Sequence, residues 1–169
     1  MRTDPPESAS ETAQLTGFLD HQRATLLLKT EGLTREQLAR QHAPSSMTLA
    51  GLLYHLAHVE ESWSVEEFSG QPLPDPWPGM DWSADRDREW HVAVDLEPDE
   101  LRRRYEEACR RTREVVAATS DLDALSAGSL RNGNRFSLRW MLLHLLEETA
   151  RHNGHADLLR EAVDGAVGE

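Results

Sequence analysis

Residues 145–155 read LLEETARHNGH, a stretch that places carboxylates and two imidazoles beside leucines. An α-helix turns by about 100° per residue, so side chains three and four positions apart share one face. With this spacing, one helical stripe contains both apolar and ionisable side chains, namely Met141, Leu145, Glu148, His152, His155 and Leu159. We therefore expect a helix that turns polar groups toward the interior of a helical bundle.

A carboxylate among leucines is costly to bury unless it is neutralised or meets a cation. Glu148 and His152 are four residues apart, so their side chains meet on one helix face. Imidazole is the commonest metal ligand in proteins. A bound divalent metal is the simplest explanation for this pair, and it requires at least a third ligand from elsewhere.

Histidines on two segments compete for the remaining positions around such a metal. Residues 48–68 also have helical periodicity, and His55 falls at the flank of the apolar face of this segment. His55 is therefore the favoured third ligand, whereas His58 is expected to point toward solvent. His144 and His155 lie near the face of Glu148 and are alternatives, either as ligands or as groups that orient a ligand. The clustering of these side chains on two helices favours metal binding over isolated core histidines.

The chain has 169 residues, enough for one domain with a substantial core, and we expect a single domain over 1–169 with a flexible segment at 1–8. The single cysteine, Cys109, cannot form an internal disulfide. No apolar run approaches the ~20 residues that span a bilayer, and the N-terminus lacks the apolar core of a secretory signal. We expect a cytoplasmic protein that is not embedded in a membrane.

The net charge of −12 argues against nucleic acid as a partner. Proteins that bind the phosphate backbone need clustered lysine and arginine to displace counterions. Arginine and glutamate alternate along 102–111, a pattern typical of a solvated helix face with weak ion pairs.

Helical periodicity predicts four long helices, over residues 10–30, 48–68, 98–119 and 137–163. The sequence from Thr34 to Gln37 is a capping-box pattern and predicts a short additional helix. Pro98 at a first-turn position, Ser137 as an N-cap and Gly165 as a terminator mark other helix ends. The predicted fold is an all-α, up-and-down four-helix bundle with a long crossover between its second and third helices.

The predicted crossover, residues 71–97, contains four prolines and a segment at 83–94 that favours a short helix. Connections of this length are often functional in compact domains. Trp77, Trp82 and Trp90 either help to cover a pocket or seal the core beneath the loop, and the sequence leaves both interpretations open.

Two longer patterns resemble a known superfamily. The last helix reads SLRW at 137–140 and EETARHNGHAD at 147–157, and the second reads TLAGLLYHLAHVEESW at 48–63. These patterns resemble the DinB-like superfamily of four-helix-bundle metalloproteins. The Glu-x3-His pair is similar to that of the branch related to mycothiol-dependent maleylpyruvate isomerase.

The resemblance implies a divalent metal held by His55, Glu148 and His152. Two imidazoles and a carboxylate suit several divalent ions, among which we place zinc first and nickel second. The resemblance also implies a low-molecular-weight thiol cosubstrate, such as mycothiol or bacillithiol, which attacks an electrophilic substrate. Members are often dimers, so a homodimer is expected, although nothing in the sequence locates an interface.

Three hypotheses follow for the function. In the first, the protein is a metal-dependent thiol S-transferase or a related hydrolytic enzyme, and His144, His155 or Tyr54 orient or protonate the reactants. In the second, a non-catalytic bundle binds a metal, a small ligand or a partner protein. In the third, the polar face is a hydrogen-bonded network without a metal.

Overall fold

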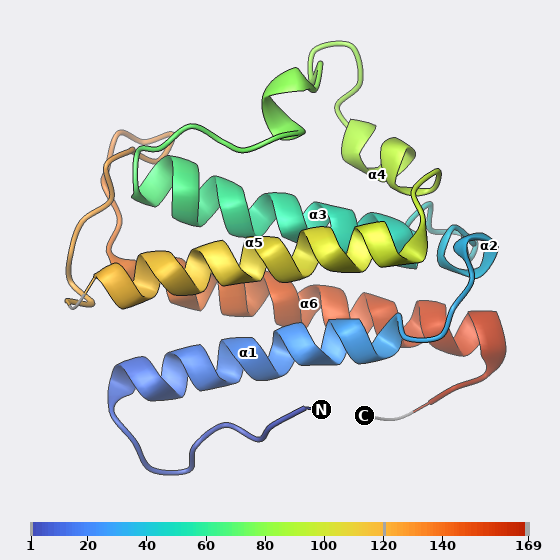
Figure 1. Cartoon of the computed structure of the whole chain (residues 1–169), viewed down its shortest axis with the longest axis horizontal. Coiled ribbons are helices and arrows are strands. Elements are labelled where there is room, and N and C mark those ends of the chain that lie inside the picture. Colours follow the sequence, from blue (N-terminus) through green and yellow to red (C-terminus); the bar gives the residue numbers. More distant parts are fainter. Residues whose placement is uncertain (1, 120, 168–169) are drawn as a thin grey trace.

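The computed structural model describes residues 2–119 and 121–167, which fold as a helical bundle (Figure 1). These residues form no β-strand, only an isolated bridge between Leu125 and Ser137. The predicted all-α four-helix bundle with a long second connection is confirmed. Its long helices are α1 (Glu11–Lys29), α3 (Leu49–Glu61), α5 (Pro98–Ala118) and α6 (Leu138–Asp164).

Four shorter helical elements complete the described fold, namely α2 (Arg35–Leu38), the π-helical η1 (Ser62–Phe68), the 3-10 turn η2 (Trp77–Gly79) and α4 (Arg88–Ala93). Because η1 continues α3 directly, the second predicted helix exists over 48–68 but widens from α to π geometry near its end. The sequence pattern did not predict this widening.

The capping signals in the sequence act as expected. Thr34 and Gln37 form both hydrogen bonds of a capping box, and the Ser137 side chain accepts from the backbone N–H of Trp140. Pro98 opens α5, and Gly165 ends α6 in the left-handed conformation at φ 78°. These four signals therefore locate helix ends to within about one residue.

The short helix in the crossover is smaller than its predicted range of 83–94. A side-chain oxygen of Asp81 accepts hydrogen bonds from the backbone N–H groups of Ser83 (3.0 Å) and Ala84 (3.1 Å). Such local bonds to an aspartate favour a turn over a helix. The helix accordingly begins only at Arg88.

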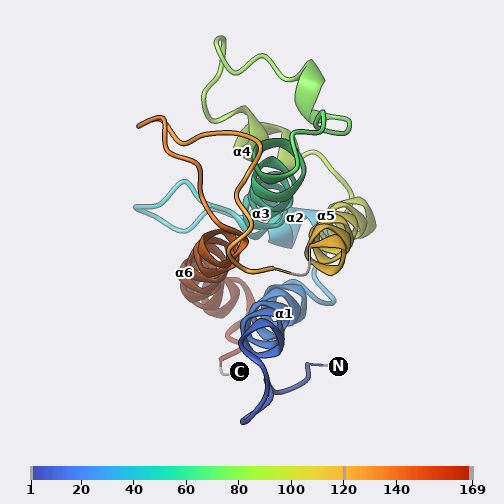
Figure 2. The ribbon, with the colours of Figure 1, turned by 90° about the vertical axis from the view of Figure 1, so that its left-hand side faces the viewer.

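The long connection carries the chain back along the bundle, so that α5 runs in the same direction as α3 (Figure 1). The four long helices therefore do not alternate in direction as the predicted up-and-down order requires. Arg102, near the start of α5, donates to the carbonyl of Leu27 near the end of α1. Arg160, near the end of α6, donates to the carbonyl of Lys29. Thus α1 and α6 run one way and α3 and α5 the other, and the end-on view places α1 and α3 at opposite corners (Figure 2).

The N-terminal segment lies against α1. The carbonyl oxygen of Thr3 is 3.1 Å from Nδ1 of His21, and a Cβ at Gly17 would come within 2.7 Å of Pro6. Met1 lies outside the described residues, and flexibility of 1–8 stays a prediction. Among the described helices, none combines the length and apolar character needed to cross a membrane.

Candidate metal centre

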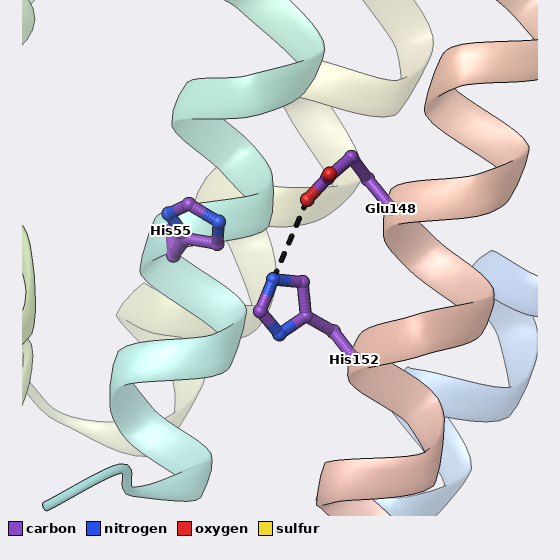
Figure 3. A group of neighbouring side chains, drawn as sticks. All are labelled: His55, Glu148 and His152. Carbon is purple, nitrogen blue, oxygen red and sulfur yellow. Dashed lines mark ion pairs between the residues drawn. The ribbon is translucent and has the colours of Figure 1, made fainter.

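Three side chains from two helices converge on one point. His55 reaches inward from α3, and Glu148 and His152 reach toward it from α6 (Figure 3). One ligand atom from each lies within 4.8 Å of the other two. The structure therefore brings together the three residues that the sequence selected as ligands.

The spacing of Glu148 and His152 fits two ligands of one metal ion. Oε2 of Glu148 is 3.5 Å from Nε2 of His152, too long for a good hydrogen bond. Two ligand atoms, each about 2.1 Å from a tetrahedral zinc ion, are about 3.4 Å apart. The carboxylate and the imidazole are thus separated as two ligands of one ion would be.

The Glu148 side chain is 19% exposed and lies at the margin of the core. Its other oxygen is 3.6 Å from the guanidinium of Arg151, on the solvent side. The group is therefore partly desolvated but still accessible to a solute.

His152 is prepared to act as a neutral ligand. Burial and the neighbouring His55 lower the pKa of His152 to about 4, although the Glu148 carboxylate opposes this shift. The ring therefore keeps a lone pair for a metal near neutral pH. Its Nδ1 lies 3.3 Å from Nδ1 of His155, so His155 contacts a candidate ligand and is placed to orient it.

Glu89 in α4 is a site residue that the sequence analysis missed. Its carboxylate lies 2.7 Å from Nδ1 of His55 and 3.1 Å from Nδ1 of His58. A carboxylate only accepts, so the hydrogen-bond network assigns the Nδ1–H tautomer to both rings and leaves Nε2 of His55 for a metal. Burial raises the pKa of Glu89, but the two imidazole hydrogen bonds outweigh it and hold the pKa at about 2.

The prediction that His58 points toward solvent is wrong. Its ring packs against Trp77, with centroids 4.7 Å apart, and stacks on Trp82 at 4.9 Å. His58 does face away from the apolar stripe of α3, but the crossover folds over it. A helical-wheel argument could not anticipate this cover, because it considers one helix at a time.

Both interpretations of the crossover tryptophans find support. Trp77 is buried, packs edge-on against Tyr54 and donates through its indole N–H to Glu61, so it seals the core. Trp90 instead stacks on the candidate ligand His55, with centroids 5.1 Å apart. The crossover thus covers one side of the metal centre.

Two of the expected catalytic side chains, His144 and Tyr54, pack against aromatic residues outside the converging group. His144 stacks on Trp140, with centroids 5.0 Å apart, and packs against Trp63 at 4.5 Å. Tyr54 is buried against Trp77 and lies beneath the Arg104 guanidinium; burial raises its pKa, while Arg104 opposes the shift. Neither residue belongs to the converging group, and their catalytic roles stay predictions.

The model of the mycothiol-S-transferase family matches residues 14–165, which include all three converging residues. The chain belongs to the mycothiol-S-transferase family. It is thus a DinB-like protein, as the two helix patterns predicted.

Structural comparison agrees with this membership. A crystal structure of a conserved protein from Enterococcus faecalis matches with a TM-score of 0.72 and 14% identity, over 94% of this chain and 100% of that chain. At this identity the likeness shows the fold alone. No curated protein sequence matches this member of the mycothiol-S-transferase family.

One sequence signal could have indicated that the segment around Glu89 has a function. The four residues REWH at 88–91 place a carboxylate between other polar groups and beside an indole in an otherwise proline-rich connection. Such a cluster is unusual for a plain linker. It does not show which helix the segment packs on, and that packing is what brings Glu89 to the histidines.

Proposed function

We propose that this protein is a metal-dependent thiol S-transferase. The convergence of His55, Glu148 and His152, whose ligand atoms lie within 4.8 Å of one another in a chain of the mycothiol-S-transferase family, is the observation that supports this proposal. The proposed cosubstrate is a low-molecular-weight thiol of the mycothiol or bacillithiol type. The second substrate is an electrophile.

The donor set supports a catalytic type of metal site. Three protein ligands leave a coordination position open, as catalytic zinc sites do. Zinc is the first choice of ion and nickel the second, because two imidazoles and one carboxylate suit both. When bound, the ion would act as a Lewis acid and lower the pKa of a thiol, so that the thiol reacts as its anion near neutral pH.

The protein side chains have separate parts in this proposal. Glu89 holds His55 in one tautomer, His152 is neutral and ready to bind, and Glu148 supplies the negative charge. In the transfer the thiol loses its proton and its sulfur forms a bond to the electrophilic carbon. In a substitution, the leaving group departs with the electron pair of its bond to that carbon.

The test begins with metal content. Untagged protein should carry about one divalent ion per chain by elemental analysis, and Glu148→Ala should lose it. Glu147→Ala is the matched control, because Glu147 is an exposed neighbour paired with Arg151. Unchanged metal content in Glu148→Ala would refute the ligand assignment.

Turnover is the second part of the test. Loss of mycothiol or bacillithiol thiol groups is followed with a panel of electrophiles, before and after metal removal. Metal-dependent consumption supports the S-transferase. A stoichiometric metal without turnover on the whole panel would favour a non-catalytic metal-binding bundle. The homodimer and the cytoplasmic location stay predictions.

A further inference from the structure

A cavity lies between η1 and the connection that joins α5 to α6. Figure 1 shows this connection beside the end of α3. The cavity has a volume of about 640 Å³ and is lined by Ser62, Trp63, Glu67 and residues 129–132. We call this cavity the aromatic cleft. Small-molecule sites commonly have volumes of about 300–1,000 Å³.

One wall of the aromatic cleft belongs to an aromatic cluster. The Trp63 ring lies 4.5 Å from His144, 5.3 Å from Trp140 and 5.4 Å from Phe136, measured between centroids. Trp140 is 38% exposed and its neighbour Leu143 is 48% exposed, so apolar surface continues out of the cluster. Such exposed aromatic surface is a feature of ligand sites.

The opposite wall is attached firmly to η1. The backbone N–H groups of Ala127 and Gly128 donate to the carbonyls of Phe68 (2.8 Å) and Glu67 (2.7 Å). Gly128 has little room for a side chain, since a Cβ there would lie 2.9 Å from the backbone carbonyl oxygen of Glu67 and 2.5 Å from its Oε2. The Glu67 carboxylate therefore lies against this part of the loop. The aromatic cleft is thus a preformed feature, and π-helical segments such as η1 often occur at functional sites.

The aromatic cleft is close enough to serve the metal centre. His144 precedes Glu148 by four residues on α6, a distance of about 6 Å along the helix axis. Trp63 follows His55 by eight residues in the neighbouring helix, or about 12 Å. The Trp63 ring contacts His144, which lies one helical turn before Glu148, so a substrate bound against Trp63 would have to extend about one turn to reach the three converging residues.

We propose that the aromatic cleft binds the electrophilic substrate and selects planar aromatic electrophiles that carry an anionic or polar oxygen-bearing substituent. The Trp63 ring and Leu130 supply apolar contact for a flat ring. The planar guanidinium of Arg131 matches carboxylate-like groups. Because the Glu67 carboxylate also lines the cleft, beside Gly128, an anionic substituent would lie at Arg131 and away from Glu67. That the bound molecule is a substrate rests on the proposed function. Binding of the molecule in the aromatic cleft does not.

Binding is tested first, without turnover. The probe is 2,4-dinitrophenolate, a flat, unreactive anion, followed by equilibrium dialysis; 2,4-dinitroanisole is its neutral counterpart. We expect Trp63→Leu to weaken binding of both probes about tenfold, which corresponds to about 1.4 kcal/mol. Arg131→Gln should weaken binding of the phenolate but not of the anisole.

Phe18→Leu is the matched control, because Phe18 is an exposed aromatic side chain on α1, outside the aromatic cleft. It should bind both probes as the wild type does. Equal affinity of wild type, Trp63→Leu and Arg131→Gln for the phenolate would overturn the proposal. Circular dichroism and metal content verify that each variant is folded.

Turnover then separates this inference from the proposed function. With 1-chloro-2,4-dinitrobenzene the thiol sulfur bonds to the ring carbon, chloride leaves with the C–Cl electron pair, and the thiol proton passes to the buffer. Trp63→Leu should raise KM about tenfold for this substrate and leave KM for iodoacetamide, which has no ring, within twofold. An unchanged KM for the aromatic substrate would overturn the cleft assignment while the S-transferase stands. Probe binding that depends on Trp63, without any turnover, would support the binding site and refute the S-transferase.

Discussion

Glu148 combines two properties that a ligand for an exchangeable metal needs. It is partly desolvated, so its charge is screened less than in water, yet it is accessible enough for a solute to approach. A fully buried carboxylate would favour its neutral form, and a fully exposed one would attract a cation only weakly. This intermediate burial is consistent with an open metal site.

Metal binding at these residues should stabilise the fold. At a free-ion concentration of 100 times Kd, binding contributes about 2.7 kcal/mol, which raises Tm by about 5–11 °C for a chain of this length. We expect this rise when zinc is added to chelator-treated wild type, measured by scanning fluorimetry. His55→Ala should lose it, and His91→Ala should keep it, because His91 pairs with Asp85 away from the centre. A full rise in His55→Ala would contradict the assignment.

Cys109 is the only thiol of the chain and should not take part in transfer. It is buried in the bundle, and burial together with the Glu60 carboxylate raises the pKa of the thiol, while Arg23 and Arg113 oppose the shift. The thiolate is the reactive form. In the native protein, we therefore expect Cys109 to react with an aromatic disulfide reagent at least about 100-fold more slowly than in guanidinium-unfolded protein. Comparable rates would show that the thiol is accessible.

At the scale of elements, α4 contributes Glu89 to the candidate metal centre, where it contacts His55. Mutation of a carboxylate that accepts a hydrogen bond from a metal-binding imidazole typically changes metal affinity 10–100-fold. Glu89→Gln should weaken zinc binding by about that factor, measured by competition with a chromogenic chelator. Glu89→Gln should also change the nitrogen NMR signals that report the His55 tautomer. A structural change away from His55 would leave these signals unchanged.

Asp85→Asn provides the matched control for this variant. Asp85 lies 2.7 Å from Nδ1 of His91, so the substitution alters an equally short carboxylate–imidazole contact on the same connection, away from the candidate ligands. Zinc affinity should be unchanged in Asp85→Asn. An equal loss in both variants would mean that the connection as a whole, rather than Glu89, supports the site.

The elements differ in how far the sequence could predict them. Periodicity and caps are local, so the four long helices and the ends at Ser137 and Gly165 could be predicted. The pair Glu148 and His152 is also local, and the position of His55 at the flank of an apolar helix face made it the favoured third ligand, which the DinB-like resemblance also implied. Glu89 could not be predicted, because its role depends on how a proline-rich connection packs on α3.

At the scale of the whole molecule, a buried ion pair crosses the middle of the bundle. Nε and a terminal nitrogen of Arg23 in α1 donate to the two Glu60 oxygens in α3, at 2.6 and 2.5 Å, and both side chains are almost fully buried. Because α1 and α3 occupy opposite corners (Figure 2), this pair joins helices that pack mainly against other neighbours. It therefore links the half of the bundle formed by α1 and α6 to the half formed by α3 and α5.

Removing one partner of this pair should cost much more than removing an exposed ion pair. Arg23→Ala leaves the Glu60 carboxylate buried without its partner, so we expect the free energy of unfolding to fall by about 3–5 kcal/mol in a urea titration. Arg110→Ala, which breaks exposed contacts to Glu107 and Glu114 on α5, should leave the free energy of unfolding almost unchanged. The double variant Arg23→Met, Glu60→Leu removes both charges and should recover part of the loss, because the cost arises from the unpaired charge rather than from the missing contact. If Arg23→Ala and Arg110→Ala are equally mild, the pair does not hold the two halves together.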